Sequence, residues 1–289
     1  MTVCVAAIFN DGGIIGITDK MLSTDDMTFE PKGTSKKIFC LSKGINAMNA
    51  GHVGIQAEIM EALQSSFKVE LDAAASYTVK GWVDLYVECY NRLKRDRVKD
   101  SVFAPYKLDE NSFLVRQREF SDIFTRELMD QVARFHLPET ATIIAGVDAS
   151  TGHLEPHIYC IKRGYYENAI ECCDAVGYAA IGTGARHVEA QFMQAKFTRH
   201  FSLPKALFLA YLAKKRSEIA PGVGKESDLF LIGPPLGVNT SLGNILDYKQ
   251  LDQMYETIVS NEKNEMDCSF QAMAKILEGK LQFQPSPFD

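Results

Sequence analysis

The order of the predicted strands and helices is the feature that most constrains the fold of this chain. Apolar runs bounded by turn residues predict strands at the start and again in the middle of the sequence, and two consecutive helices follow each group of strands. A parallel sheet built from βαβ units would instead need one crossover helix between successive strands. Helices that come in pairs favour an α+β fold, in which antiparallel sheets are covered by helical layers.

The first fifty residues are predicted to form two β-hairpins. In the first, the runs Val3–Phe9 and Ile14–Asp19 flank an Asn-Asp-Gly-Gly turn. In the second, Lys37–Leu41 and Ile45–Ala50 flank a Ser-Lys-Gly turn. A polar loop connects the two hairpins.

Apolar spacing predicts the remaining elements. The expected helices are Val53–Val69, about Ala73 to Arg95, Phe120–Phe135, Ala185–Arg199 and Pro204–Ile219, and the expected later strands are Ala141–Val147, Ile158–Lys162, Gly177–Ile181 and Asp228–Ile232. We expect a single domain over residues 1–289. The stretch 98–138 is interpreted as an insertion with a loop around Pro105, and 244–289 as a C-terminal helical extension.

Composition excludes several classes of protein. A hydrophobic fraction of 46% is too high for a disordered chain, and a net charge of −6 argues against a nucleic-acid-binding surface. No apolar run is long enough for a transmembrane helix, and the N-terminus lacks the features of a signal peptide. The seven cysteines are odd in number and form no CxxC pair, which favours reduced thiols over disulfides or zinc. We therefore expect a cytoplasmic protein.

The registers of the two hairpins predict that four polar groups meet at one edge of the fold. If the first hairpin turns about its Asp-Gly pair, Asp19 lies across from Cys4 and diagonally from Thr2. If the second turns about its Lys-Gly pair, Lys37 lies close to Gly51. This edge would then hold a threonine, a carboxylate, a lysine and a glycine amide.

These groups are the ones that an N-terminal nucleophile requires. Removal of Met1 would leave Thr2 with a free α-amine, whose pKa of about 7.7–8 allows it to take the proton of the adjacent hydroxyl at neutral pH. An ammonium from Lys37 would favour the developing alkoxide, and Asp19 would keep that lysine charged and oriented. The backbone N–H of Gly51 could stabilise a tetrahedral oxyanion.

The segment from Thr2 to Gly51 resembles the N-terminal part of proteasome β-type subunits, which belong to the N-terminal nucleophile hydrolase family. The resemblance rests on the leading threonine, on DGGIIGITDK with its aspartate, on KKIF with its lysine, and on NAGHVG with its glycine. It covers roughly residues 2–98 and 140–232. It implies a four-layer αββα sandwich, hydrolysis of peptides or unfolded proteins, and assembly into a homo-oligomeric ring. We expect no cofactor, and we expect no interaction with a membrane or with nucleic acid.

Two later motifs extend the resemblance. AAIGTGARHVEAQF is similar to the strand-to-helix corner of the family and places Thr183 where a hydroxyl helps to position the terminal amine. KKRSEIAPGVG is similar to the next loop and places an acid at Glu218. The chain departs from the family at Pro221, where a serine is usual, and Thr183 stands in place of the commoner serine.

These departures keep two further hypotheses open. The chain could be a catalytically silent subunit of the same fold, with a role in assembly or regulation. It could also hydrolyse the amide bond of a small molecule, which the same nucleophile chemistry permits.

Other motifs give weaker signals. Gly182-Thr183-Gly184 follows a strand and opens a helix, as a dinucleotide-binding loop would, but His187 replaces the third glycine and no acidic residue follows at the expected distance. His153 and His157 lack a third metal ligand and are interpreted as structural. For Cys4, packing in the core is favoured over a second nucleophile.

Overall fold

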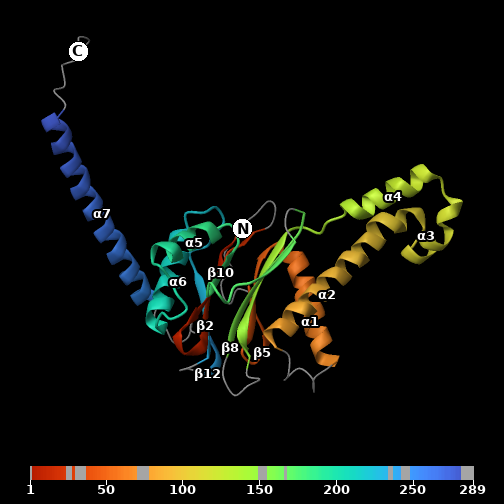
Figure 1. The fold of residues 1–289 in the computed structure, drawn as a ribbon, viewed down its shortest axis with the longest axis horizontal. Coiled ribbons are helices and arrows are strands. Elements are labelled where there is room, and N and C mark those ends of the chain that lie inside the picture. Colours follow the sequence, from red (N-terminus) through yellow and green to blue (C-terminus); the bar gives the residue numbers. More distant parts are fainter. Residues whose placement is uncertain are drawn as a thin grey trace, which may run out of the picture. The chain divides into compact units, whose positions relative to one another are not determined.

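A computed structural model describes residues 2–23, 28–29, 37–69, 78–148, 155–165, 168–233, 237–241 and 248–280 of the chain (Figure 1). The chain divides into two compact units, Met1–Gly243 and Asn244–Asp289, and each is described by itself. The second unit begins where the C-terminal extension was expected. Within it, the described residues form a single helix, α7 (Tyr248–Lys280).

The first unit holds two five-stranded sheets in which all neighbouring strands are antiparallel. The first sheet has the order β10-β1-β2-β11-β12, with β1 Cys4–Phe9, β2 Gly13–Asp19, β10 Tyr178–Ile181, β11 Ser227–Gly233 and β12 Gly237–Ser241. The second has the order β5-β6-β7-β8-β9, with β5 Ile38–Ser42, β6 Ile45–Gly51, β7 Thr140–Asp148, β8 Glu155–Arg163 and β9 Ala169–Cys172. A short ribbon pairs β3 (Leu22–Ser23) with β4 (Thr28–Phe29). The prediction of antiparallel sheets in a mixed fold is confirmed.

One hydrophobic core cluster joins the two sheets. It draws buried side chains such as Ile8 and Phe230 from the first sheet and Met48, Ile143 and Ile158 from the second. Because side chains alternate between the two faces of a strand, these residues define the face of each sheet that is turned toward the other. The two N-terminal hairpins therefore belong to different sheets that share one apolar core.

Two pairs of helices cover the sheets (Figure 1). Helices α1 (Val53–Val69) and α2 (Val79–Val98) pack on the second sheet, through a cluster that includes Trp82, Tyr86 and Ile144. Helices α5 (Ala185–Gln194) and α6 (Leu203–Ser217) contact strands β1, β2 and β10 of the first sheet.

Several helix boundaries differ from the predicted ones. Helix α2 begins at Val79 and is capped by Thr78, whose hydroxyl accepts a hydrogen bond from the N–H of Gly81. The start expected near Ala73 lies outside the described residues. Helix α5 ends at Gln194 and not at Arg199. Ser202 occupies the N-cap position of α6 without a capping hydrogen bond from its side chain.

The register of the first hairpin differs by one residue from the predicted one. Cys4 pairs with Thr18, because the connection is a turn of 3-10 helix over Asn10–Gly12 with Asp11 in the left-handed region at φ 67°. Asp19 therefore lies beside Val3, whose carbonyl accepts its N–H at 3.2 Å. The shift brings Asp19 closer to Thr2 than the prediction did.

The register of the second hairpin is also corrected. Ile38 pairs with Met48, and an irregularity between Cys40 and Ser42 moves the pairing by one residue along β5. The Lys37 carbonyl consequently accepts the N–H of Asn49 at 3.0 Å, so that Lys37 lies opposite Asn49, two residues before Gly51. A bulge of this kind inserts one extra residue and re-aims the side chains beyond it.

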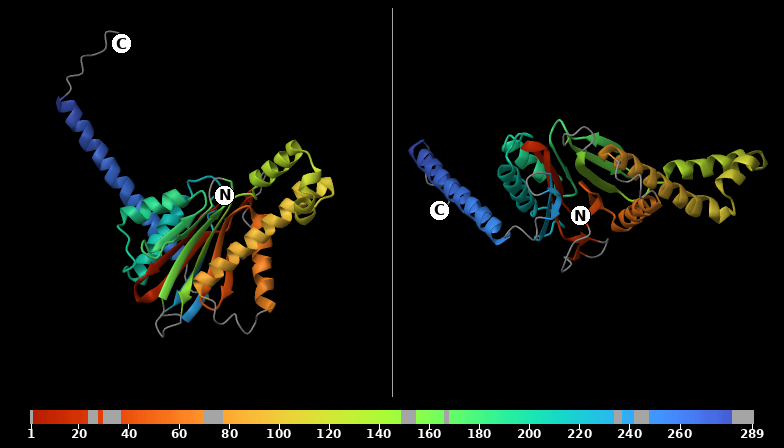
Figure 2. Two further views of the ribbon diagram at one scale, coloured as in Figure 1. Left: turned by 45° about the vertical axis from the view of Figure 1, so that its right-hand side comes forward. Right: turned by 90° about the horizontal axis from the view of Figure 1, so that it is seen from below.

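The stretch 98–138 is helical around Pro105, where a loop was predicted (Figure 2). The chain continues from α2 through short helical turns, and Pro105 sits in the first turn of one of them, where its missing N–H leaves no hydrogen bond unmade. Helices α3 (Glu110–Arg116) and α4 (Asp122–Arg134) follow. We call residues 98–135 the arm.

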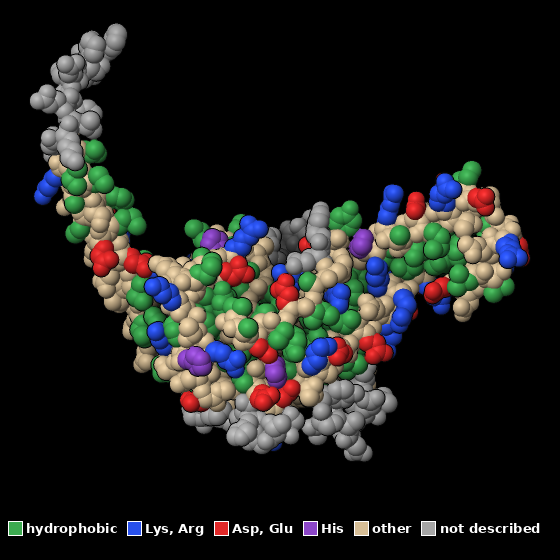
Figure 3. All heavy atoms as spheres, viewed as in Figure 1, with side chains coloured by type: hydrophobic (Ala, Val, Ile, Leu, Met, Phe, Trp, Pro, Cys, Tyr) green, Lys and Arg blue, Asp and Glu red, His purple; other side chains and the backbone are tan. Residues whose placement is uncertain are grey.

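The arm has a small core of its own. Val102, Phe103, Phe113 and Leu128 are buried together, and the ring of Phe103 lies 5.8 Å from that of Phe113. Apolar side chains also remain on its surface (Figure 3), namely Leu114, Val115, Ile123 and Met129.

This core predicts how the arm responds to mutation. Phe113→Ala removes a ring that is 2% exposed and should cost about 3–5 kcal/mol of local stability. Amide hydrogen exchange should then show loss of protection over α3 and α4, with β7 and β8 unchanged. The matched control Leu114→Ala, in which a side chain 58% exposed is removed, should leave protection intact. Equal effects of the two substitutions would contradict this core.

Candidate active site

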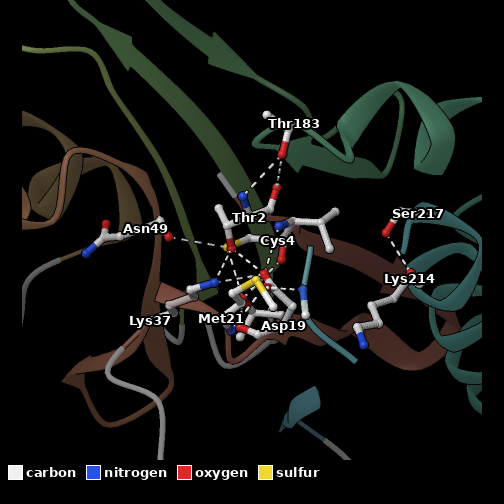
Figure 4. A network of polar contacts seen from close by, with 12 residues as sticks. Thr2, Cys4, Asp19, Met21, Lys37, Asn49, Thr183, Lys214 and Ser217 are labelled. Atoms are coloured by element: carbon white, nitrogen blue, oxygen red, sulfur yellow. Dashed lines mark hydrogen bonds and ion pairs between the residues drawn. The ribbon is translucent and has the colours of Figure 1, made fainter. Parts of the chain in front are cut away.

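The hydroxyl of Thr2 lies between a cation and a carboxylate (Figure 4). Thr2 lies two residues before the start of β1 and is buried, and its Oγ1 donates a hydrogen bond to Oδ1 of Asp19 at the end of β2. The Nζ of Lys37, just before β5, donates to the same hydroxyl oxygen. The structure thus brings together three of the predicted site residues from three segments of the chain.

Asp19 accepts the largest number of hydrogen bonds in this cluster. Its side chain is completely buried, and it forms an ion pair with Lys37 at 2.9 Å. Oδ1 also accepts the N–H of Val3 at 2.9 Å, while Oδ2 accepts the N–H groups of Gly224 at 2.9 Å and Met21 at 3.1 Å. A buried carboxylate is tolerated when it is paired and hydrogen-bonded in this way, and such charge-assisted bonds hold it in one orientation.

Gly51 lies at the mouth of the same site, where a side chain could not be accommodated. Its φ is +106°, and a Cβ atom there would approach the carbonyl oxygen of Glu139 to 2.4 Å. Gly51 and Thr2 line one cavity of about 390 Å³. Gly51 is therefore exposed at the cavity that Thr2 also lines, and its role as an oxyanion donor stays a prediction.

Thr183 contacts the backbone of Thr2. Its Oγ1 lies 3.3 Å from the nitrogen of Thr2, 3.3 Å from its carbonyl oxygen, and 3.4 Å from the carbonyl oxygen of Pro221. A hydroxyl has one proton to donate and can accept as well, so it can accept from the Thr2 nitrogen while donating to one of the two carbonyls. Thr183 is thus placed to orient the nitrogen from which an α-amine would form.

The glycines on either side of Thr183 lie close to the backbone of Thr2. Gly182 has a φ of +93°, and a Cβ there would come within 2.2 Å of the Thr2 carbonyl oxygen. The N–H of Gly184 donates to that same oxygen at 3.3 Å. The loop that resembles a dinucleotide-binding motif therefore packs closely against the backbone of Thr2.

Glu218 does not join the cluster around Thr2. Its carboxylate forms ion pairs with Lys214 at 2.8 Å and with Lys215 at 3.2 Å. Lys214 is completely buried, and its Nζ also donates to the carbonyl of Lys225 at 2.7 Å. Burial lowers the pKa of Lys214, and the neighbouring Glu218 partly opposes that shift.

Lys214 is the residue of this region that sequence reasoning missed. Lys225, whose carbonyl it binds, directly follows Gly224, which donates its N–H to Asp19. Lys214 and Glu218 therefore anchor the loop that completes the hydrogen bonding of the buried carboxylate. The i,i+4 spacing of Lys214 and Glu218 was visible in the sequence, but such pairs usually lie on a solvated helix face.

Cys4 and the histidines singled out in the sequence have no contact that indicates a catalytic or metal-binding role among the described residues. Burial raises the pKa of the Cys4 thiol to about 11, so that it stays protonated at neutral pH. His157 Nδ1 lies 2.7 Å from a carboxylate oxygen of Asp174, and His52 accepts the N–H of Ile55 at the start of α1. His153 lies outside the described residues. In the described part of the chain, no group of three or more His, Cys, Asp or Glu side chains could hold a metal ion.

Comparison of the sequence with protein-family models and with curated proteins finds no match. Among the helices of the described residues, none has both the length and the apolar character needed to cross a membrane.

The anchoring role of Lys214 can be tested by removing its charge. Lys214→Met leaves the Lys225 carbonyl without its donor and weakens the pairing of Glu218, and removing one partner of a buried pair costs about 3–5 kcal/mol. Lys215→Met is the matched control, because Lys215 pairs with the same carboxylate but is partly exposed, and its loss should cost below about 1 kcal/mol. Urea unfolding would measure both values. Equal losses would contradict a special role for Lys214.

Proposed function

We propose that the protein is an N-terminal threonine hydrolase that cleaves peptide bonds. The observation that carries this proposal is the position of the Thr2 hydroxyl, which contacts the ammonium of Lys37 and the carboxylate of Asp19 inside a buried cluster. A cation beside a hydroxyl favours its alkoxide form, and the low polarity of a buried site strengthens that effect.

The first step requires a free amine at Thr2. Removal of Met1 would convert the Thr2 nitrogen into an α-amine, which would remain within reach of Thr183 Oγ1. This amine takes the proton of the Thr2 hydroxyl as the oxygen attacks the substrate carbonyl carbon. Lys37 stabilises the developing negative charge on Oγ1, and the ion pair with Asp19 holds the ammonium of Lys37 in position.

The later steps use the same groups. The attack forms a C–O bond and a tetrahedral oxyanion, which the backbone N–H of Gly51 stabilises. When the C–N bond breaks, the leaving amine takes the proton from the Thr2 ammonium, and an ester on Thr2 remains. Water, deprotonated by the same amine, then hydrolyses that ester, releases the acid and regenerates the hydroxyl.

The arrangement of the fold supports the proposal. Two sheets share one apolar core, and a pair of helices covers each of them, as expected for the four-layer αββα sandwich that the resemblance implies. Pro221, where the family has a serine, still reaches Thr183 through its backbone carbonyl. We further propose, on the resemblance alone, that copies of the chain assemble into a ring.

Substitution of Thr2 tests the proposal. Thr2→Ala removes the nucleophilic oxygen and should lower kcat for a panel of fluorogenic peptide amides by at least ~10³-fold. Thr2→Ser keeps a hydroxyl and should retain measurable activity. Wild-type activity in Thr2→Ala would overturn the assignment.

The mass of the intact protein provides a second test. The proposal expects loss of Met1, so that residue 2 becomes the first residue. Retention of Met1 in protein purified from its native source would favour the catalytically silent subunit instead. Thr2-dependent cleavage of small amides but not of peptides would favour the small-molecule amidase.

A further inference from the structure

A buried glutamine that the proposed reaction does not use holds the backbone next to Gly51. Gln56 lies in the first turn of α1, and its Nε2 donates to the carbonyl oxygen of Ala50 and, at 3.4 Å, to that of Ala141. A side-chain amide carries two N–H donors, so it can make both bonds at once. The inference drawn from these contacts rests on the proposed function, because it concerns the N–H of Gly51, which that function places against the oxyanion.

The carbonyl of Ala50 and the N–H of Gly51 belong to one peptide group. A trans peptide group is planar, and its C=O and N–H point in opposite directions. A hydrogen bond that fixes the direction of the Ala50 carbonyl therefore also fixes the direction of the Gly51 N–H. If the group rotated, both would turn together.

The strand register shows to which side the Gly51 N–H points. The N–H of Asn49 donates to the Lys37 carbonyl at 3.0 Å, and every second N–H of a strand points to the same side. The N–H of Gly51 therefore points to the side of β6 from which Lys37 comes, and Lys37 carries the ammonium that contacts the Thr2 hydroxyl. The Ala50 carbonyl points the other way, toward β7.

Gln56 acts at the end of β6, where its pairing with β7 stops. Ala50 and Gly51 form the last two pairs of these strands, and terminal pairs open more readily than central ones. By binding one carbonyl of each strand, the glutamine side chain joins the two strands at this point. On the far side of Gly51, the N–H of His52 donates to the Glu139 carbonyl at 3.0 Å. Each of the two peptide groups that flank Gly51 is thus held by a specific contact.

We propose that Gln56 is a positioning residue for the reaction, which keeps the N–H of Gly51 directed at the oxyanion. Its amide binds no reacting atom and acts through the peptide group between Ala50 and Gly51. Both residues of that group line the cavity that Thr2 also lines. Because the oxyanion exists only after the hydroxyl has attacked, loss of this orientation should weaken binding of the transition state and leave binding of the substrate unchanged.

Substitution of the glutamine amide tests the proposal by kinetics. Gln56→Met keeps the length of the side chain and removes both donors, and it should lower kcat for the peptide amides that the wild type cleaves about 10-fold or more, with KM changed by less than about twofold. Gln64→Met is the matched control, because Gln64 is exposed on the same helix, and it should leave both constants unchanged. A purely structural role would lower the melting temperature without this split between kcat and KM. Wild-type kcat in Gln56→Met, or an effect confined to KM, would overturn the proposal.

A second variant covers the case in which Gln56→Met does not fold. Gln56→Glu keeps the size of the side chain, and burial raises the pKa of a carboxyl group. The protonated carboxyl has one O–H that can donate to the Ala50 carbonyl, whereas the carboxylate has none and repels that oxygen. The ratio of kcat in Gln56→Glu to kcat in the wild type should therefore fall as the pH rises. A ratio close to one at every pH, or one that increases with pH, would contradict the positioning role.

Amide NMR of the protein without substrate separates this proposal from the proposed function. The nitrogen chemical shift of Gly51 depends on hydrogen bonding at the Ala50 carbonyl of the same peptide group, so Gln56→Met should shift or broaden the Gly51 resonance and leave that of Gly184 unchanged. An unmoved Gly51 resonance would overturn the proposal, whatever the activity. A moved resonance in a protein that cleaves no peptide would refute the proposed function instead, with Gln56 still holding the peptide group.

Discussion

The buried carboxylate of Asp19 is the group on which the rest of this site depends. A charge without any exposed surface is stable only when it is paired and its oxygens are hydrogen-bonded, and here an ammonium, a hydroxyl and three backbone N–H groups do this. These donors come from the start of the chain, from the ends of two hairpins, and from the loop before β11. The requirements of one carboxylate therefore fix the relative positions of Thr2, Lys37 and Gly224.

A second set of contacts keeps this cluster in place. The loop around Thr183 surrounds the backbone of Thr2, and the buried pair of Lys214 and Glu218 holds the loop that carries Gly224. Gly182 and Thr183 also line the cavity that Thr2 shares with Gly51, whereas Lys214 and Glu218 do not. A catalytic arrangement gains from such support, because reacting groups lose their effect when they are displaced by about 1 Å.

Much of this site was predictable from the sequence, because residue types and turn signals placed Thr2, Asp19, Lys37 and Gly51 near one another at the ends of short strands. The registers were not, since a three-residue 3-10 turn and a bulge each shift a hairpin by one residue. The link from Glu218 through Lys214 to the loop that carries Gly224 could not be predicted, because the burial of Lys214 arises only from tertiary packing. Within the arm, the helix predicted at Phe120–Phe135 is found as α4, whereas the helical turns around Pro105 and helix α3 were not predicted, because Pro105 was interpreted as a loop residue.

The central claim is that the hydroxyl of Thr2 is a nucleophile activated by its own amine. The most direct measurement is peptide mapping by mass spectrometry after treatment with a β-lactone, which acylates a reactive hydroxyl. Our account predicts one acyl group, located on Thr2 as the first residue of the mature chain, and none after Lys37→Met. Acylation elsewhere, or an unmodified Thr2 in protein that cleaves peptides, would contradict it.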